Sequence, residues 1–60
     1  LSAEQQRRLK RMEIDDRLKE LKKEEAAALR KTREEDERLR IKNMYADRRD
    51  RLYEERSRCL

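Results

Sequence analysis

The sequence predicts an all-α fold made of a single long extended helix, which can include a short coiled-coil segment. The chain has no Gly and no Pro, the residues that most often interrupt a helix. Good helix formers such as Glu, Lys, Arg, Leu and Ala fill most positions, and β-branched residues are limited to Ile14, Thr32 and Ile41. We therefore interpret residues 1–60 as one charged helical segment, a fragment or small subunit of a larger assembly. A continuous helix of 60 residues would be about 90 Å long.

The two ends of the chain and its charge spacing support this helix. Ser2 followed by Gln5 matches a capping box, and Arg56 and Arg58 suit the negative end of a helix dipole. Acids precede bases by four residues at Glu4–Arg8, Glu13–Arg17, Asp15–Lys19, Glu34–Arg38, Asp36–Arg40, Asp47–Arg51 and Glu54–Arg58. Each such pair stabilises an exposed helix by about 0.2–0.5 kcal/mol. A solvated helix without partners, or a chain disordered in isolation, is the simpler alternative.

The few apolar residues occupy opposite flanks of the predicted rod in different parts of its length. At about 100° per residue, one stripe runs through the middle of the chain and a second covers the opposite side further along. We expect these flanks to contact protein partners on alternating faces. The candidate partner-binding residues are Ile14, Leu18, Leu21, Ala28, Leu39, Ile41, Met44, Tyr45, Leu52 and Tyr53.

Self-association along the full length is disfavoured by the charges at the seam. A homodimeric coiled coil needs one apolar seam over three or four heptads. In the best register, the seam contains the leucines together with polar and charged residues, namely Glu25, Thr32, Glu35, Lys42, Arg49 and Arg56. Burying unpaired charges against a second copy costs more than the remaining leucine contacts return. A coiled-coil oligomerisation segment stays open as an alternative.

Charge is distributed in three blocks. Residues 1–12 carry a net charge of +3, residues 13–37 carry −3, and residues 38–60 carry +4. Such a chain can lie across an acidic surface with its ends anchored. A nucleic-acid-binding helix would present a more continuous basic face, so nucleic acid is an unlikely partner, although an RNA-associated helix of a ribonucleoprotein stays open. No apolar run is long enough for a membrane span, and no membrane partner is expected.

Composition argues against catalysis, and no catalytic residue, cofactor or metal ligand is assigned. The chain has no His, the commonest general base, and no Gly-rich loop that could cradle phosphate. With one Cys, it can form no internal disulfide, and a lone thiol cannot build a zinc site. Cys59 is expected to make an apolar contact, and its free thiol favours a reducing, intracellular compartment.

The segment REEDERLRIKNMYADRRDRLYEERSR, from Arg33 to Arg58, resembles the Glu/Arg-rich helices of trichohyalin/plectin-homology proteins. That group includes filament proteins of cilia and of the lumen of doublet microtubules. The resemblance spans about half the chain and rests on composition, Leu/Tyr spacing and charge pairing. It implies a long non-catalytic helix that contacts tubulin or neighbouring helical filament proteins in the cytoplasm, the cytoskeleton or a cilium. It carries over no individual functional residue.

The function predicted from the sequence is therefore a non-catalytic structural or docking helix that contacts protein partners, most consistent with a cytoskeletal (microtubule or ciliary) assembly. The coiled-coil oligomerisation segment and the RNA-associated helix are the alternatives.

Overall fold

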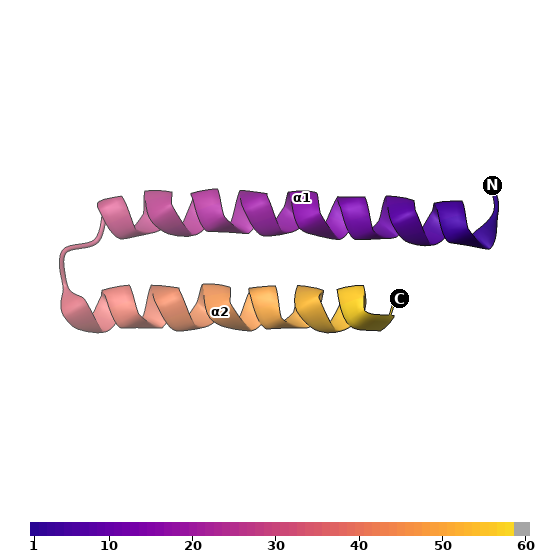
Figure 1. The fold of residues 1–60 in the computed structure, drawn as a ribbon. Helices are drawn as coiled ribbons and strands as arrows, with labels where there is room; N and C mark the ends of the chain where they lie inside the picture. The colour runs from indigo at the N-terminus through magenta and orange to yellow at the C-terminus, as the bar shows by residue number, and fades with distance from the viewer. Residues whose placement is uncertain (59–60) are drawn as a thin grey trace.

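The chain folds into two antiparallel helices. The computed structural model describes residues 1–58, in which α1 spans Ala3–Arg30 and α2 spans Glu35–Arg58. Residues 31–34 connect them, and the two helices lie side by side (Figure 1). The prediction of a single long extended helix is therefore wrong. The structure extends 49 Å along its longest axis. The predicted apolar contact of Cys59 lies outside the described residues.

The start of α1 is fixed by the capping box predicted from the sequence. The Ser2 hydroxyl accepts a hydrogen bond from the backbone N–H of Gln5 at 3.2 Å, and the Gln5 side chain accepts one from the backbone N–H of Ser2 at 3.0 Å. These two bonds satisfy donors that have no partner within the helix. The predicted capping box is confirmed.

Replacing Ser2 with Ala should lower the free energy of unfolding by about 1 kcal/mol. The Gln5 N–H would lose its acceptor, and the first turn of α1 would fray. Urea denaturation followed by circular dichroism measures this loss. The matched control is Ser57→Ala, which removes a hydroxyl that donates to the Tyr53 carbonyl within α2 and should shift stability by less than about 0.5 kcal/mol. Equal losses for the two variants would contradict the capping role.

The turn between the helices needs no glycine because no described residue has a positive φ. Lys31 ends α1 in a right-handed conformation, with φ −89° and ψ −7°. The Thr32 hydroxyl donates to the Ala28 carbonyl at 2.9 Å. One nitrogen of Arg38, Nη1, donates to the carbonyls of Leu29 at 2.6 Å and Thr32 at 2.8 Å. The carbonyls of Ala28 and Leu29, in the last turn of α1 where a helix leaves its carbonyls unsatisfied, thus find partners within the hairpin.

The start of α2 is marked by acidic residues. Its first turn contains Glu35, Asp36 and Glu37, and Glu34 precedes it and accepts the first backbone bond, from Arg38, at 3.0 Å. Carboxylates are stabilised beside the positive end of a helix dipole. The acidic run therefore favours a new helix N-terminus at this point.

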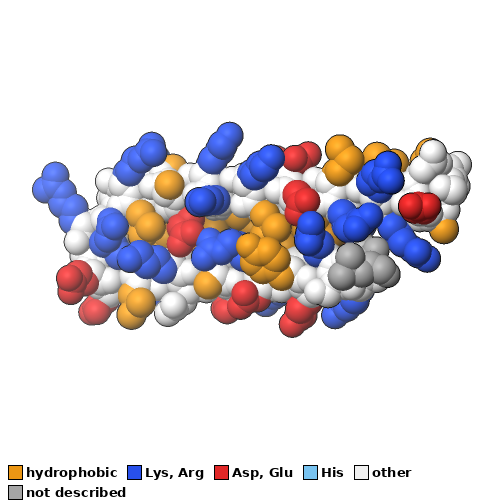
Figure 2. Space-filling model, viewed as in Figure 1, with side chains coloured by type: hydrophobic (Ala, Val, Ile, Leu, Met, Phe, Trp, Pro, Cys, Tyr) orange, Lys and Arg blue, Asp and Glu red, His pale blue; other side chains and the backbone are white. Residues whose placement is uncertain are grey.

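The hydrophobic contact between the helices is narrow. Ile14 and Leu21 of α1 and Tyr45 of α2 are buried. Around them lie half-buried apolar side chains, namely Leu18, Ala28, Leu29, Ile41, Ala46 and Leu52. Figure 2 shows hydrophobic side chains along the line where the helices meet, with charged side chains over both edges. Spacings of three and four residues place each set on one side of its helix.

Candidate protein-interaction surface

Seven of the ten candidate partner-binding residues lie in the contact between α1 and α2. Ile14, Leu21 and Tyr45 are buried there, and Leu18, Ala28, Ile41 and Leu52 are half-buried. On a straight rod the apolar stripes would face opposite sides, but the turn at residues 31–34 reverses the chain and brings them together. The alternating-face geometry depended on the single helix and is overturned with it. Each stripe packs against the other half of the same chain.

Three ion pairs join the two helices and fix their register. Arg49 Nη1 lies 2.6 Å from Glu25 Oε1, and Arg56 Nε lies 3.0 Å from Asp15 Oδ1. Near the N-terminal end of α1, Lys10 Nζ lies 3.0 Å from Glu55 Oε1. The first pair is the most shielded from water, with the Glu25 side chain 15% exposed and that of Arg49 28% exposed.

These pairs explain why the seam tolerates its charges. Glu25, Arg49 and Arg56 lie at seam positions. In a homodimer, the seam of a second copy would bury these charges in an apolar contact, and for this reason the sequence disfavours self-association. In the antiparallel hairpin, Glu25 faces Arg49, and Arg56 faces Asp15. Opposite charges at close range offset part of the cost of leaving water.

Tyr45 combines an apolar and a charged contact at the centre of α2. Its ring is buried in the contact between the helices, and the guanidinium carbon of Arg48 lies 5.3 Å from the ring centroid. This distance falls within the range of a cation–π interaction. Arg48 is exposed, so it covers one edge of the core while remaining in contact with water.

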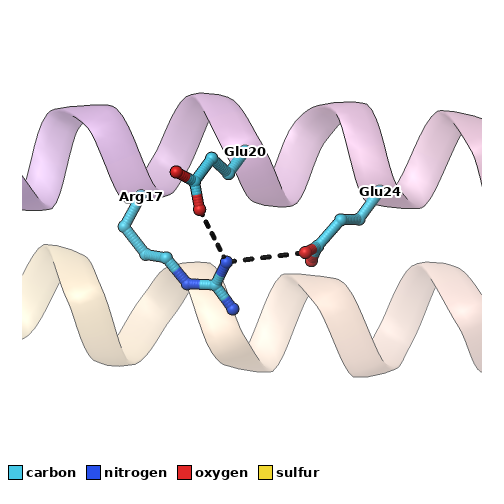
Figure 3. A network of polar contacts seen from close by, with 3 residues as sticks. All are labelled: Arg17, Glu20 and Glu24. Carbon is cyan, nitrogen blue, oxygen red and sulfur yellow. Dashed lines mark hydrogen bonds and ion pairs between the residues drawn. The ribbon is translucent and has the colours of Figure 1, made fainter.

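One exposed flank of α1 carries a local charge cluster. Arg17 Nη1 donates to Glu20 Oε2 at 3.0 Å and lies 3.5 Å from Glu24 Oε1 (Figure 3). The hydrogen bond to Glu20 is the main reason that the pKa of Arg17 is raised above its usual value, and Glu24 adds to the effect. One base thereby engages two carboxylates. Of the pairs predicted at four-residue spacing, Glu54 and Arg58 lie 3.9 Å apart.

Large apolar side chains stay exposed after the hairpin has formed. On α2, Leu39 is 58% exposed and Tyr53 is 52% exposed, and their spacing of two heptads places them on the same side of the helix. Met44, the third candidate residue outside the core, lies on a different side. On α1, Leu9 and Met12 are also exposed. The exposed apolar side chains are thus distributed over both helices and over more than one side of α2.

Within residues 1–58 no group of three or more His, Cys, Asp and Glu side chains is arranged to hold a metal ion. Neither α1 nor α2 is long and apolar enough to cross a membrane. No protein-family model, curated protein or solved structure matches the chain.

Proposed function

We propose that the chain is a non-catalytic structural element that docks onto protein partners as a preformed helical hairpin, in a cytoskeletal (microtubule or ciliary) assembly. The observation that carries the proposal is the exposure of Leu39 and Tyr53 on one side of α2, while seven of the other candidate residues lie in the contact between the helices. Burying an exposed leucine or tyrosine side chain against a partner contributes about 1.5–3 kcal/mol before ordering costs. The cytoskeletal setting derives from the resemblance of Arg33–Arg58 to Glu/Arg-rich filament helices.

A small folded hairpin suits a docking role energetically. Its core contains three buried side chains, and domains of this size often depend on a partner for part of their stability. A partner that binds only the folded hairpin raises its apparent stability by mass action. Because the turn is already formed, the hairpin loses less conformational entropy on binding than a disordered segment would.

Cosedimentation of the chain with purified microtubules tests this proposal. We expect the chain to pellet with the polymer in a saturable way, and the double variant Leu39→Asp/Tyr53→Asp to bind at least tenfold more weakly, because two apolar contacts would be replaced by charges. Both positions are more than half exposed, so circular dichroism should show unchanged helicity.

The matched control is Ala3→Asp/Gln6→Asp, which makes the same change of charge at exposed positions of α1, away from Leu39 and Tyr53. It should bind within about twofold of the original chain, since surface substitutions of this kind have small effects. Failure of the unaltered chain to pellet would refute tubulin as the partner. A tight, concentration-dependent dimer in sedimentation would instead support the coiled-coil oligomerisation segment.

A further inference from the structure

The side of α1 that flanks the core carries a row of bases without carboxylate partners. Within the part of the chain that the structure describes, no acid pairs with the row's four bases, which are Lys19, Lys22, Lys23 and Arg30. These side chains and Ala26 line an open groove of about 460 Å³. Figure 2 shows Lys and Arg side chains gathered along α1 on one face of the molecule.

The acids that lie between Lys19 and Arg30 in the sequence are directed away from this row. At about 100° per residue, the residues that line the groove span about 100° of the surface of α1, and Glu20 and Glu24 fall outside that arc. Both of these carboxylates instead engage Arg17. The helix therefore separates its charges into a neutralised flank and a basic flank.

We infer that this basic groove, lined by Lys19, Lys22, Lys23, Ala26 and Arg30, binds an acidic helical segment of a partner protein. Carboxylates at spacings of three and four residues would match the spacing of the bases, which extend about 17 Å along the axis. Ala26 has the only short side chain in the groove, so a second helix can approach closely there and contact the aliphatic stems of the lysines. The inference rests on the proposed docking to proteins. It adds a second docking surface, the basic groove of α1, and specifies an acidic partner for it.

An acidic peptide fits this groove better than nucleic acid does. Duplex DNA carries one charge per roughly 1.7 Å of axis, and its phosphates would extend beyond the short row of bases toward Asp16, Glu20 and Glu24. A peptide can place a few carboxylates opposite the bases and an apolar side chain over Ala26. The groove offers both kinds of contact.

Fluorescence anisotropy with a labelled peptide tests the inference. The probe is a roughly 15-residue helical peptide of Glu, Leu and Ala with Glu at three- and four-residue spacings, long enough to cover the groove. We expect saturable binding that Lys22→Gln/Lys23→Gln weakens about tenfold, since two exposed charge pairs would be lost. The control Arg7→Gln/Arg8→Gln makes the same change of charge outside the groove and should change binding less than twofold.

Four outcomes would overturn the inference. The first is that the peptide does not bind, and the second is that both double variants weaken its binding equally. The third is that a single-stranded oligonucleotide of equal charge binds more tightly than the peptide. The fourth is that the chain forms a dimer in sedimentation and a second copy thereby competes with the peptide. Failure here is distinguishable from failure of the proposed function. The Lys22→Gln/Lys23→Gln variant tests the groove, whereas Leu39→Asp/Tyr53→Asp tests docking through the exposed apolar side of α2.

Discussion

Replacing Leu21 with Asp should unfold the hairpin. Leu21 is 1% exposed and is the most completely buried large side chain of the described chain. Truncating a buried leucine to alanine already costs about 2–5 kcal/mol, and the substituted carboxylate would also lose its hydration without a partner in the core. A core of this size rarely supplies more than about 3–5 kcal/mol in total, so one substitution removes all of it.

Circular dichroism and nuclear Overhauser contacts between α1 and α2 measure this result. We expect Leu21→Asp to lose the contacts between Ile14 and α2 and most of its helical signal at room temperature. The matched control is Leu39→Asp, the same chemical change at a side chain that is 58% exposed, which should shift stability by less than about 0.5 kcal/mol. If the two variants kept the same helicity, Leu21 would lie on the surface and the hairpin would not be the folded state.

The sequence carried enough information for the helices but not for the turn between them. Helix content follows from local propensity, and the Ser2 cap follows from two residues three positions apart. A turn at residues 31–34 without Gly or Pro lacks the usual signals of chain reversal. It is stabilised in part by Arg38, which reaches back nine residues to the Leu29 carbonyl. Such a contact exists only after the chain has reversed, so no helical spacing could reveal it.

Two local signals were nevertheless present in the sequence. Thr32 is β-branched, and its hydroxyl competes for a helix carbonyl four residues earlier. The acidic run at residues 34–37 follows it directly and is the composition favoured at a helix N-terminus. Together they mark the end of one helix and the start of another.

The apolar residues of the candidate surface were predictable from the sequence, but their positions in the folded molecule were not. The ten candidate residues are apolar and cluster on two flanks of a straight helix. Without the turn, nothing distinguished Leu21, which is buried, from Leu39, which is exposed. Chain reversal decides which apolar residues fold the molecule and which stay available to a partner. The basic groove depends on a local arrangement within α1, in which Glu20 and Glu24 engage Arg17.

Reversing one charge of the shielded ion pair should have the second-largest effect. Arg49→Glu would place a carboxylate beside Glu25, whose side chain is 15% exposed. The pair would lose its attraction and gain a repulsion between two partly desolvated acids, at a cost of about 2–4 kcal/mol. Urea denaturation should show a corresponding loss, close to the full stability of a hairpin with so small a core.

The double variant Glu25→Arg/Arg49→Glu tests whether the loss of stability comes from the broken ion pair, because it keeps one acid and one base but exchanges their positions. It restores opposite charges across the same contact, so we expect it to recover at least half of the lost stability, with a coupling energy of about 3 kcal/mol in the double-mutant cycle. Arg58→Glu is the control, because its partner Glu54 lies 3.9 Å away on the exposed side of α2, where reversal should cost less than about 0.5 kcal/mol. A coupling energy near zero would mean that Glu25 and Arg49 do not face each other. The antiparallel register, which explains how charged seam positions are tolerated, would then be wrong.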